Sequence, residues 1–252
     1  PHLHLEMSET TSANVPVLPD VELNLLTPKA PATARIVENR VATRESSPNI
    51  VRHITFDLTG TGLEGRLRTG QSIGVLPPGT DAKGKPHKVR LYSLSSPTAG
   101  EGGQPHLAST TVKRAIDEVD GRLYTGVASN YLCDLKPGDD VQVSGPSGKR
   151  FLLPADARNW NYVFFGTGTG VAPFRAMVQE LYAEPYAGQC ALVFGCAYRT
   201  DLLYAEEFET LAAQEAGFHY LLSVSREGRR ADGSKDYVQS KLEDRADLLL
   251  PM

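Results

Sequence analysis

The sequence pattern changes near Pro154, and this change limits the possible fold more than any other feature. Between about residue 33 and that proline, short runs rich in β-branched residues are separated by clusters of glycine, proline and aspartate. Many short strands at such spacing are typical of a closed antiparallel barrel. After residue 155, buried-strand runs alternate with segments of helical periodicity, which predicts a parallel sheet with right-handed crossovers. Among these segments we expect one helix over residues 202–213 and another over residues 237–250.

We therefore predict an α+β chain of two domains. An antiparallel β-barrel domain covers residues 33–154, and an α/β domain with a parallel sheet covers residues 155–252. Residues 1–32 lack periodicity and contain four prolines, so we expect an extended or disordered leader.

Composition excludes several classes of protein. The 252 residues carry a formal net charge of −4, which argues against a generically basic nucleic-acid-binding protein. No run of about 18 apolar residues indicates a membrane span, and no segment resembles a secretory signal. The three cysteines form neither a CxxC pair nor an even set, so we expect reduced thiols, a cytoplasmic location and no metal site.

A glycine-rich loop follows the first strand expected in the α/β domain. Between Phe164 and Pro173, glycines stand at positions 166, 168 and 170, directly before a helical segment. Glycine lets another backbone or a ligand approach closely, and a helix N-terminus offers free N–H groups to a phosphate. The loop is not GxGxxG, because Pro173 occupies the third glycine position, and it is not a Walker A loop. It favours anion binding, and the alternative is a tight strand–helix turn.

A second group of polar residues follows the third buried strand of this domain. Ser225 and Arg226 come at the strand end, and Lys235, Tyr237 and Gln239 follow after a turn. In open α/β sheets, ligands lie beyond the carboxyl ends of the strands. The hydroxyl, guanidinium and ammonium groups suit a phosphate monoester, and Tyr237 can stack on a base. Each residue taken alone is more typical of a solvated surface.

A third candidate lies in the barrel, at Arg90-Leu91-Tyr92-Ser93. Alternation places Arg90 and Tyr92 on one face of the strand, and Leu91 and Ser93 on the other. An arginine and a tyrosine two residues apart can hold a phosphate and cover a flat ring. An ordinary barrel strand with one exposed arginine is the alternative.

A fourth candidate is the segment Gly126–Leu135. Ser129 or Asn130 can cap a short helix that runs to Leu135, and free N–H groups at its start can bind a second phosphate. The alternative is a capped helical turn with no ligand.

Taken in order, these segments resemble the ferredoxin–NADP⁺ reductase family, closest to its plant-type branch. The resemblance runs from about residue 30 to the end, which makes it more specific than any single glycine loop. The matching segments are Gly70–Gly74, Gly84–Lys88, Arg90–Ser93, Thr111–Arg114, Gly126–Leu135, Gly166–Arg175, Leu202–Phe208 and Ser225–Gln239.

The resemblance implies a flavoprotein oxidoreductase in which hydride passes between NADPH and FAD, and single electrons pass to a ferredoxin or flavodoxin. It implies that Tyr92 covers the isoalloxazine ring and that Ser93 lies near its N5 atom, so these two are the expected catalytic residues. The cofactor-binding residues that it implies are Arg90, Tyr92, Ser93, Thr111, Lys113, Gly126, Val127, Ala128, Ser129, Gly168, Thr169, Gly170, Pro173, Ser225, Arg226, Lys235, Tyr237 and Gln239.

Three departures from the family pattern affect these expectations. The strand and terminal segment that end the family's α/β domain do not follow Met252, and we expect that the sequence omits them. Ala128 stands where plant-type members have cysteine, a change that we expect to be tolerated. Asp117 stands where an aromatic residue often stacks on the FAD adenine, so FMN stays an alternative to FAD.

The expected electron carrier and the alternative functions depend on fewer residues. Lys83, Lys85 and Lys88 form a basic run that can steer an acidic carrier or can simply be a solvated loop. One alternative function is the NAD(P)H-dependent reductase component of an oxygenase system, of the benzoyl-CoA epoxidase type. Such components often carry an iron–sulfur module, for which this sequence has no cysteine cluster. The other alternative is a non-catalytic nucleotide-binding module.

Overall fold

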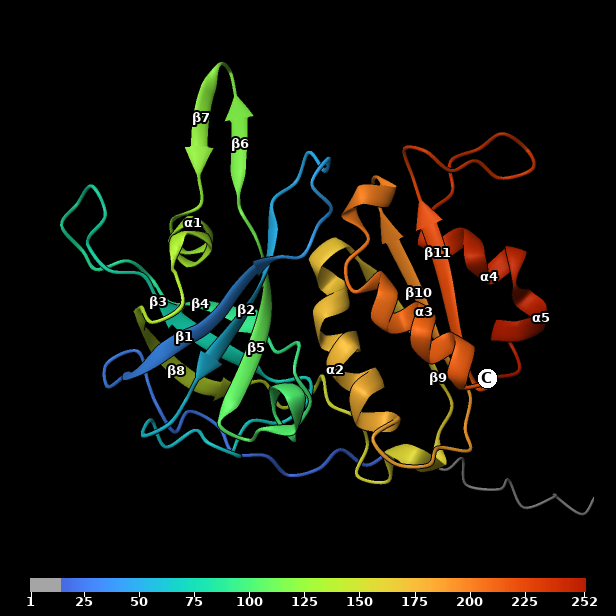
Figure 1. Ribbon diagram of the computed structural model, residues 1–252, viewed down its shortest axis with the longest axis horizontal. Helices are drawn as coiled ribbons and strands as arrows, with labels where there is room; N and C mark the ends of the chain where they lie inside the picture. Colours follow the sequence, from blue (N-terminus) through green and yellow to red (C-terminus); the bar gives the residue numbers. More distant parts are fainter. Residues whose placement is uncertain (1–14) are drawn as a thin grey trace, which may run out of the picture.

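Two sheets, one antiparallel and one parallel, form the body of the computed structural model, which describes residues 15–252 (Figure 1). They lie side by side, with the antiparallel sheet built from the first part of the chain and the parallel sheet from the second (Figure 1). This arrangement confirms the predicted two-domain α+β fold. The division at residue 154 stays a proposal; it falls in the segment between the last barrel strand and the first parallel strand.

Six strands form the antiparallel sheet, in the order β4-β3-β8-β1-β2-β5. These strands are β1 (Ala32–Val41), β2 (Val51–Asp57), β3 (Ser72–Leu76), β4 (Arg90–Ser93), β5 (Leu107–Lys113) and β8 (Asp140–Ser147). An antiparallel bridge between Leu94 and Thr110 joins the two end strands just after β4, and so closes the sheet into a barrel. Fully buried side chains such as Ile36, Ile54 and Phe56 fill its interior, as the alternating pattern requires.

A hairpin and a short helix connect β5 to β8. Strands β6 (Ile116–Val119) and β7 (Arg122–Thr125) project from the barrel, and α1 (Val127–Asp134) returns the chain to it (Figure 1). The sequence analysis missed the hairpin. Its signal was Asp120-Gly121, because both residues have the positive φ angles of a type I′ turn.

The predicted side-chain cap of helix α1 is wrong. The helix begins after Gly126, and neither Ser129 nor Asn130 caps it, because both lie inside its first turn. Their side chains bind backward instead. Asn130 Nδ2 donates to the carbonyl oxygens of Ala115 and Gly126, at 2.9 and 2.8 Å.

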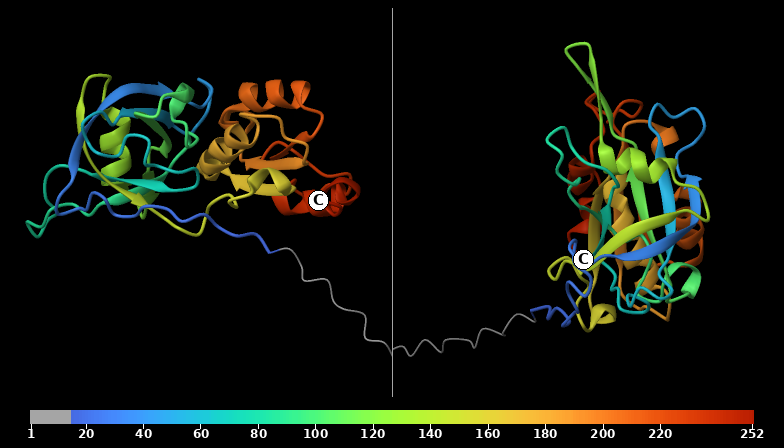
Figure 2. Two further views of the ribbon diagram at one scale, coloured as in Figure 1. Left: turned by 90° about the horizontal axis from the view of Figure 1, so that it is seen from below. Right: turned by 90° about the vertical axis from the view of Figure 1, so that its left-hand side faces the viewer.

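The parallel sheet has the order β11-β10-β9, with helices on both faces (Figure 2). Its strands are β9 (Tyr162–Thr167), β10 (Cys190–Cys196) and β11 (Phe218–Val224), and its long helices are α2 (Ala172–Leu181) and α3 (Ala205–Gln214). Every residue of β10 is buried, which is typical of a central strand covered on both faces. The strand and helix alternation predicted after residue 155 is therefore present.

Two helix predictions need correction. The segment expected as a helix from Leu202 begins only at Ala205, after a turn at Arg199–Asp201. The single helix expected over residues 237–250 is three short pieces, which are Val238–Ser240, α4 (Lys241–Asp244) and α5 (Ala246–Leu249). Arg245 leaves the helical region, with φ −132° and ψ 34°, and the resulting bend lets Leu249 pack against the β10 face.

The part of the leader that the structure describes is extended and lies along the underside of the barrel (Figure 2). Leu26 forms an antiparallel bridge with Gly145, Glu22 pairs with Arg66, and the Val17 carbonyl accepts from Ala155 N–H at 2.8 Å. The part of the leader over residues 1–14 lies outside the described residues. None of the helices within residues 15–252 is long and apolar enough to cross a membrane.

Candidate functional site

The glycine loop joins β9 to α2 at the carboxyl end of the parallel sheet. Its three glycines stand in different environments. A Cβ atom at Gly166 would lie 3.1 Å from the Phe174 ring, and Gly168 has a positive φ of 52°. Gly170 has neither constraint, because its φ is ordinary and an added Cβ would meet nothing within 4 Å. Packing therefore disfavours a side chain at the first glycine and backbone geometry disfavours one at the second, whereas neither constrains the third.

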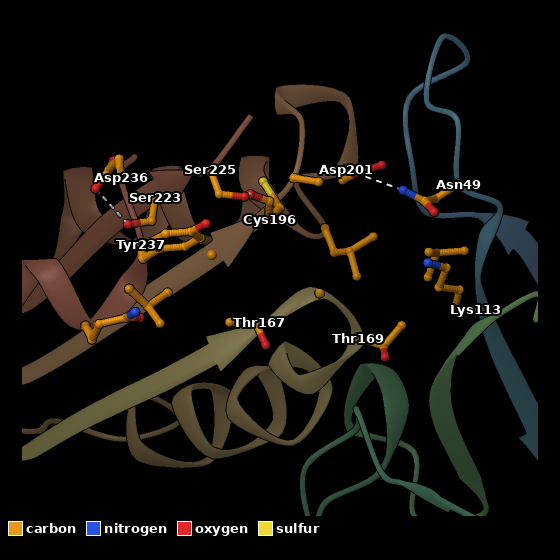
Figure 3. A pocket seen from close by; sticks show the side chains of 17 residues that line it. Asn49, Lys113, Thr167, Thr169, Cys196, Asp201, Ser223, Ser225, Asp236 and Tyr237 are labelled. Carbon is orange, nitrogen blue, oxygen red and sulfur yellow. Dashed lines mark hydrogen bonds between the residues drawn. The ribbon is translucent and has the colours of Figure 1, made fainter. Parts of the chain in front are cut away.

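A pocket of about 370 Å³ opens in front of this loop, between the two domains (Figure 3). Gly168 and Thr169 form its floor, Ser225, Tyr237 and Gln239 come from the far side of the α/β domain, and Lys113 enters from β5 of the barrel. Pro173 is buried in the first turn of α2, where its missing N–H costs nothing, and it does not line the pocket.

A second pocket of about 510 Å³ lies beside the first and shares Ser225 and Tyr237 with it. Arg226, Arg229 and Lys235 line it, together with Tyr198. The two pockets thus form a continuous path from a cationic end to the interface between the domains. Such a path suits an elongated ligand that carries a phosphate at one end.

Two polar contacts hold the wall of the first pocket across the domains. Asn49 Nδ2 donates to Asp201 Oδ2 at 3.0 Å (Figure 3). Ser47 Oγ donates to the other carboxylate oxygen at 2.5 Å. Nearby, the pKa of the Cys196 thiol is raised to about 12 by burial and by the Asp201 carboxylate. This cysteine is therefore a packed thiol at neutral pH and not a nucleophile.

The barrel strand β4 presents a separate surface. Tyr92 pairs with Ile73 and is half-buried, whereas Ser93 pairs with Ser72 and so lies on the opposite face of the strand. Tyr92 packs against the barrel core that includes Leu132 and Cys133 of α1. Burial, with a smaller contribution from the Cys133 thiol, raises the pKa of Tyr92 to about 12. A flat ligand can contact both Tyr92 and Ser93 only along the edge of β4.

The N-terminus of α1 is a further polar surface of the barrel domain. Gly126 precedes the helix without a side-chain cap, and within the described residues the N–H groups of Val127, Ala128 and Ser129 have no hydrogen-bond acceptor. The first turn carries no acidic residue. These three N–H groups and the helix dipole favour an anion.

Thr111 occupies a different environment from the one expected of a ligand-binding side chain. It is buried, and its hydroxyl contacts the Tyr204 hydroxyl of the α/β domain at 2.5 Å. Tyr204 also contacts Nδ1 of His53 at 2.9 Å, and it adopts a positive φ of 57°, which is rare for a tyrosine. Thr111 therefore joins the two domains through its hydroxyl.

Arg175 makes a second connection between the domains. Its guanidinium donates to both Glu101 carboxylate oxygens at 2.9 and 3.0 Å, and to the Ser95 carbonyl at 2.9 Å, all in the barrel domain. On the α/β side it pairs with Glu207 at 2.7 Å and lies 4.8 Å from the centre of the Tyr204 ring. Because Arg175 belongs to the first turns of α2, it fixes the glycine loop relative to the strand that carries Tyr92 and Ser93.

Comparison with known proteins matches this geometry to one family. Residues 164–251 match the model of the oxidoreductase NAD-binding domain. The chain is 40% identical to a ferredoxin–NADP reductase of Picosynechococcus, over 97% of this chain and 61% of the relative. It is 38% identical to a ferredoxin–NADP reductase of Spirulina, over 91% of this chain and 80% of the relative.

The chain belongs to the ferredoxin–NADP reductase family. A solved structure of the family, the Plasmodium falciparum enzyme with 2′P-AMP, superposes with a TM-score of 0.73 at 27% identity, covering 90% of this chain and 84% of that one. The chain spans about three-fifths of the length of the Picosynechococcus relative.

Within this member of the ferredoxin–NADP reductase family, the structure adds residues that the sequence analysis did not select. Arg229 and Tyr198 line the cationic pocket, and His53, Arg175 and Tyr204 connect the domains. The first two come from loops without a periodic signal. Arg175 and Tyr204 lay inside the matched segments but had no assigned role, and His53 carried no sequence signal at all.

Proposed function

We propose that this protein is an NADPH-dependent FAD enzyme that passes single electrons to a ferredoxin or flavodoxin. One observation carries the proposal. The cationic pocket shares Ser225 and Tyr237 with the first pocket, where the glycine loop faces Lys113 of the barrel at the interface between the domains.

The residues present fit a bound flavin nucleotide. The three free N–H groups at the start of α1 suit its pyrophosphate, and Arg90, exposed on β4, supplies a positive charge. Tyr92 would cover the ring, and Ser93 would contact it along the edge of β4. Leu91 and Val127 are 57% and 50% exposed, and such apolar surface is stabilised when a flat ring covers it.

The dinucleotide would lie along the two connected pockets. Ser225, Arg226 and Lys235 would hold the 2′-phosphate, and Tyr237 would stack on the adenine. Gly168, Thr169 and Gly170 would let the pyrophosphate approach the loop, with Lys113 facing it from the barrel. Gln239 would complete the wall next to Tyr237.

A bound FAD would supply the acceptance of two electrons from NADPH as hydride and their release one at a time. The chain itself would bind and orient both nucleotides and exclude water from the interface. The buried contacts of Arg175 and Tyr204 support this role, because they hold the binding surfaces of the two domains in a fixed relation.

A positively charged loop and the state of the cysteines support the proposed electron carrier and location. Lys83, Lys85 and Lys88 are exposed on a loop that Asp81 stabilises by accepting from two of their backbone N–H groups. This positive loop would attract an acidic carrier. We propose a cytoplasmic location, because the three cysteines are buried and free of disulfides.

The test is to purify the protein and to measure flavin content and electron transfer. A yellow protein with stoichiometric FAD, which reduces cytochrome c with NADPH only when ferredoxin is added, would support the proposal. A colourless protein, or one that contains only FMN, would contradict the cofactor assignment.

A single substitution tests the choice of NADPH over NADH. Arg226→Ala removes one charge-assisted contact with the 2′-phosphate. We expect the preference for NADPH to fall by a factor of about ten to a hundred, while the NADH reaction is unchanged. An unchanged ratio of the two kcat/KM values would show that Arg226 does not bind the phosphate.

A further inference from the structure

We infer that Arg229 is a specificity-determining residue, which supplies a third positive charge for the 2′-phosphate of the dinucleotide. This inference rests on the proposed function. It adds Arg229 to Arg226 and Lys235 as the groups that distinguish a ligand with the additional phosphate from one without it.

The second pocket concentrates positive charge. Arg226, Arg229 and Lys235 line the same cavity of about 510 Å³, and no carboxylate from residues 15–252 lines it. Among the described residues, none of the three makes an ion pair. Nearby carboxylates are engaged elsewhere. Glu227 accepts from the Arg199 N–H at 2.9 Å, and Asp236 pairs with Lys241 at 2.9 Å.

The backbone of the loop brings two of these cations close together. Arg229 and Lys235 form an antiparallel bridge, so their side chains start from the same face about 5 Å apart. Like charges placed opposite each other destabilise such a pair. A phosphate monoester carries nearly two negative charges at pH 7 and three acceptor oxygens, so it can offset this repulsion and bind all three cations.

The side chain of Arg229 is available for such a ligand. Its Nη1 donates to the Gly228 carbonyl at 2.8 Å, and within residues 15–252 its other N–H groups have no acceptor. The ring of Tyr198 lies 5.7 Å from the guanidinium carbon of Arg226, which orients that arginine beside Arg229. The phosphate would thus meet two guanidinium groups and one ammonium.

The next residue provides a matched control. Arg230 has the same charge and lies in the same loop, but it pairs with Glu243 and Asp244, both at 2.8 Å, and does not line the pocket. Arg229→Ala and Arg230→Ala therefore remove equal charge from adjacent positions, and only the first removes it from the pocket.

The experiment is calorimetric titration of the purified protein and both variants with 2′P-AMP and with AMP. We expect Arg229→Ala to weaken 2′P-AMP binding about three- to tenfold, with AMP binding unchanged. We expect Arg230→Ala to bind both ligands like the wild-type protein. Tyr198→Leu should also weaken 2′P-AMP binding. Tyr198→Phe keeps the aromatic ring and should bind 2′P-AMP like the wild-type protein.

The outcomes separate this inference from the proposed function. If the wild-type protein does not prefer 2′P-AMP over AMP, the assignment of NADP itself is wrong. If the wild-type protein prefers 2′P-AMP but Arg229→Ala binds it as tightly as Arg230→Ala does, Arg229 has no role in specificity. Circular dichroism of each variant shows that the fold is retained.

Discussion

At the scale of single residues, the best-defined charge state is that of His53. This side chain is fully buried on β2, and its pKa is lowered to about 3, mainly because burial penalises the charged form. Glu38 and Glu101 lie 3.7 and 3.8 Å away but do not outweigh the desolvation, so His53 is neutral at pH 7. Its Nδ1 contact with the Tyr204 hydroxyl belongs to this neutral form.

His53 therefore makes folding depend on pH. Below pH 6.5 the unfolded chain binds a proton that the folded protein excludes until about pH 3, so stability is lost as the pH falls through this range. We expect His53 to account for a loss of about 2 kcal/mol between pH 6.5 and pH 5. Urea unfolding at several pH values should show a shallower pH dependence for His53→Gln than for the wild-type protein.

A partly exposed histidine serves as the comparison. His219 on β11 is desolvated less, so His219→Gln should change the pH dependence less than His53→Gln does. Equal slopes for the wild-type protein and His53→Gln would mean that His53 is not buried in its neutral form.

Residue identity predicted part of the candidate site and missed the rest for a physical reason. Arg226 and Lys235 could be selected because charged groups at a strand end suggest an anion site, and both line the cationic pocket. His53 could not be selected, because it lies among apolar and β-branched residues of an ordinary strand. Its partner, Tyr204, is 151 positions away and reaches it only when the domains meet.

At the scale of the elements, hydrophobic periodicity predicted most strands and the helix after the glycine loop, and local backbone chemistry accounts for the errors. The hairpin β6–β7 is exposed along its whole length, so it has no buried face to give an alternating signal. The sequence predicts one terminal helix over residues 237–250, whereas the chain bends at Arg245 and packs Leu249 on the sheet.

The glycine loop yields a prediction that separates binding from folding. Gly170→Ala adds a methyl group that meets nothing in the protein, so the free energy of unfolding should change little. If a pyrophosphate approaches this backbone, the methyl group should weaken NADP⁺ binding by a factor of about five to thirty, or about 1–2 kcal/mol. Titration with NADP⁺ and urea unfolding measure the two effects.

Gly166→Ala should behave in the opposite way. Its Cβ atom would lie 3.1 Å from Phe174 and 3.3 Å from Val171, so the protein should be destabilised even without a ligand. Undiminished NADP⁺ binding by Gly170→Ala would mean that no ligand approaches the loop at that point.

At the scale of the whole molecule, charge and hydrogen bonds join the two domains. Arg175 is buried, and its guanidinium contacts Glu101 and Ser95 in the barrel and Glu207 in α3. The change of sequence pattern near Pro154 predicted two such domains, but no local pattern indicated how they are held together. Arg175 is separated in sequence from Glu101 by 74 positions and from Ser95 by 80 positions. Such distant residues come into contact only in the completed fold.

Arg175→Met should loosen this connection. The substitution keeps much of the apolar volume but leaves the Glu101 carboxylate partly buried without its partner, which costs about 3–5 kcal/mol. Because the lost contacts join the domains, we expect the single unfolding transition of the wild-type protein to split into two, one for each domain. Urea unfolding followed by tryptophan fluorescence and by circular dichroism should then give different midpoints, since Trp160 lies in the segment just before β9.

Arg158→Met is the matched control, because Arg158 makes an exposed pair with Glu184 at 3.4 Å, worth at most about 1 kcal/mol. Coincident midpoints for Arg175→Met, at the denaturant concentration found for Arg158→Met, would show that Arg175 does not hold the domains together.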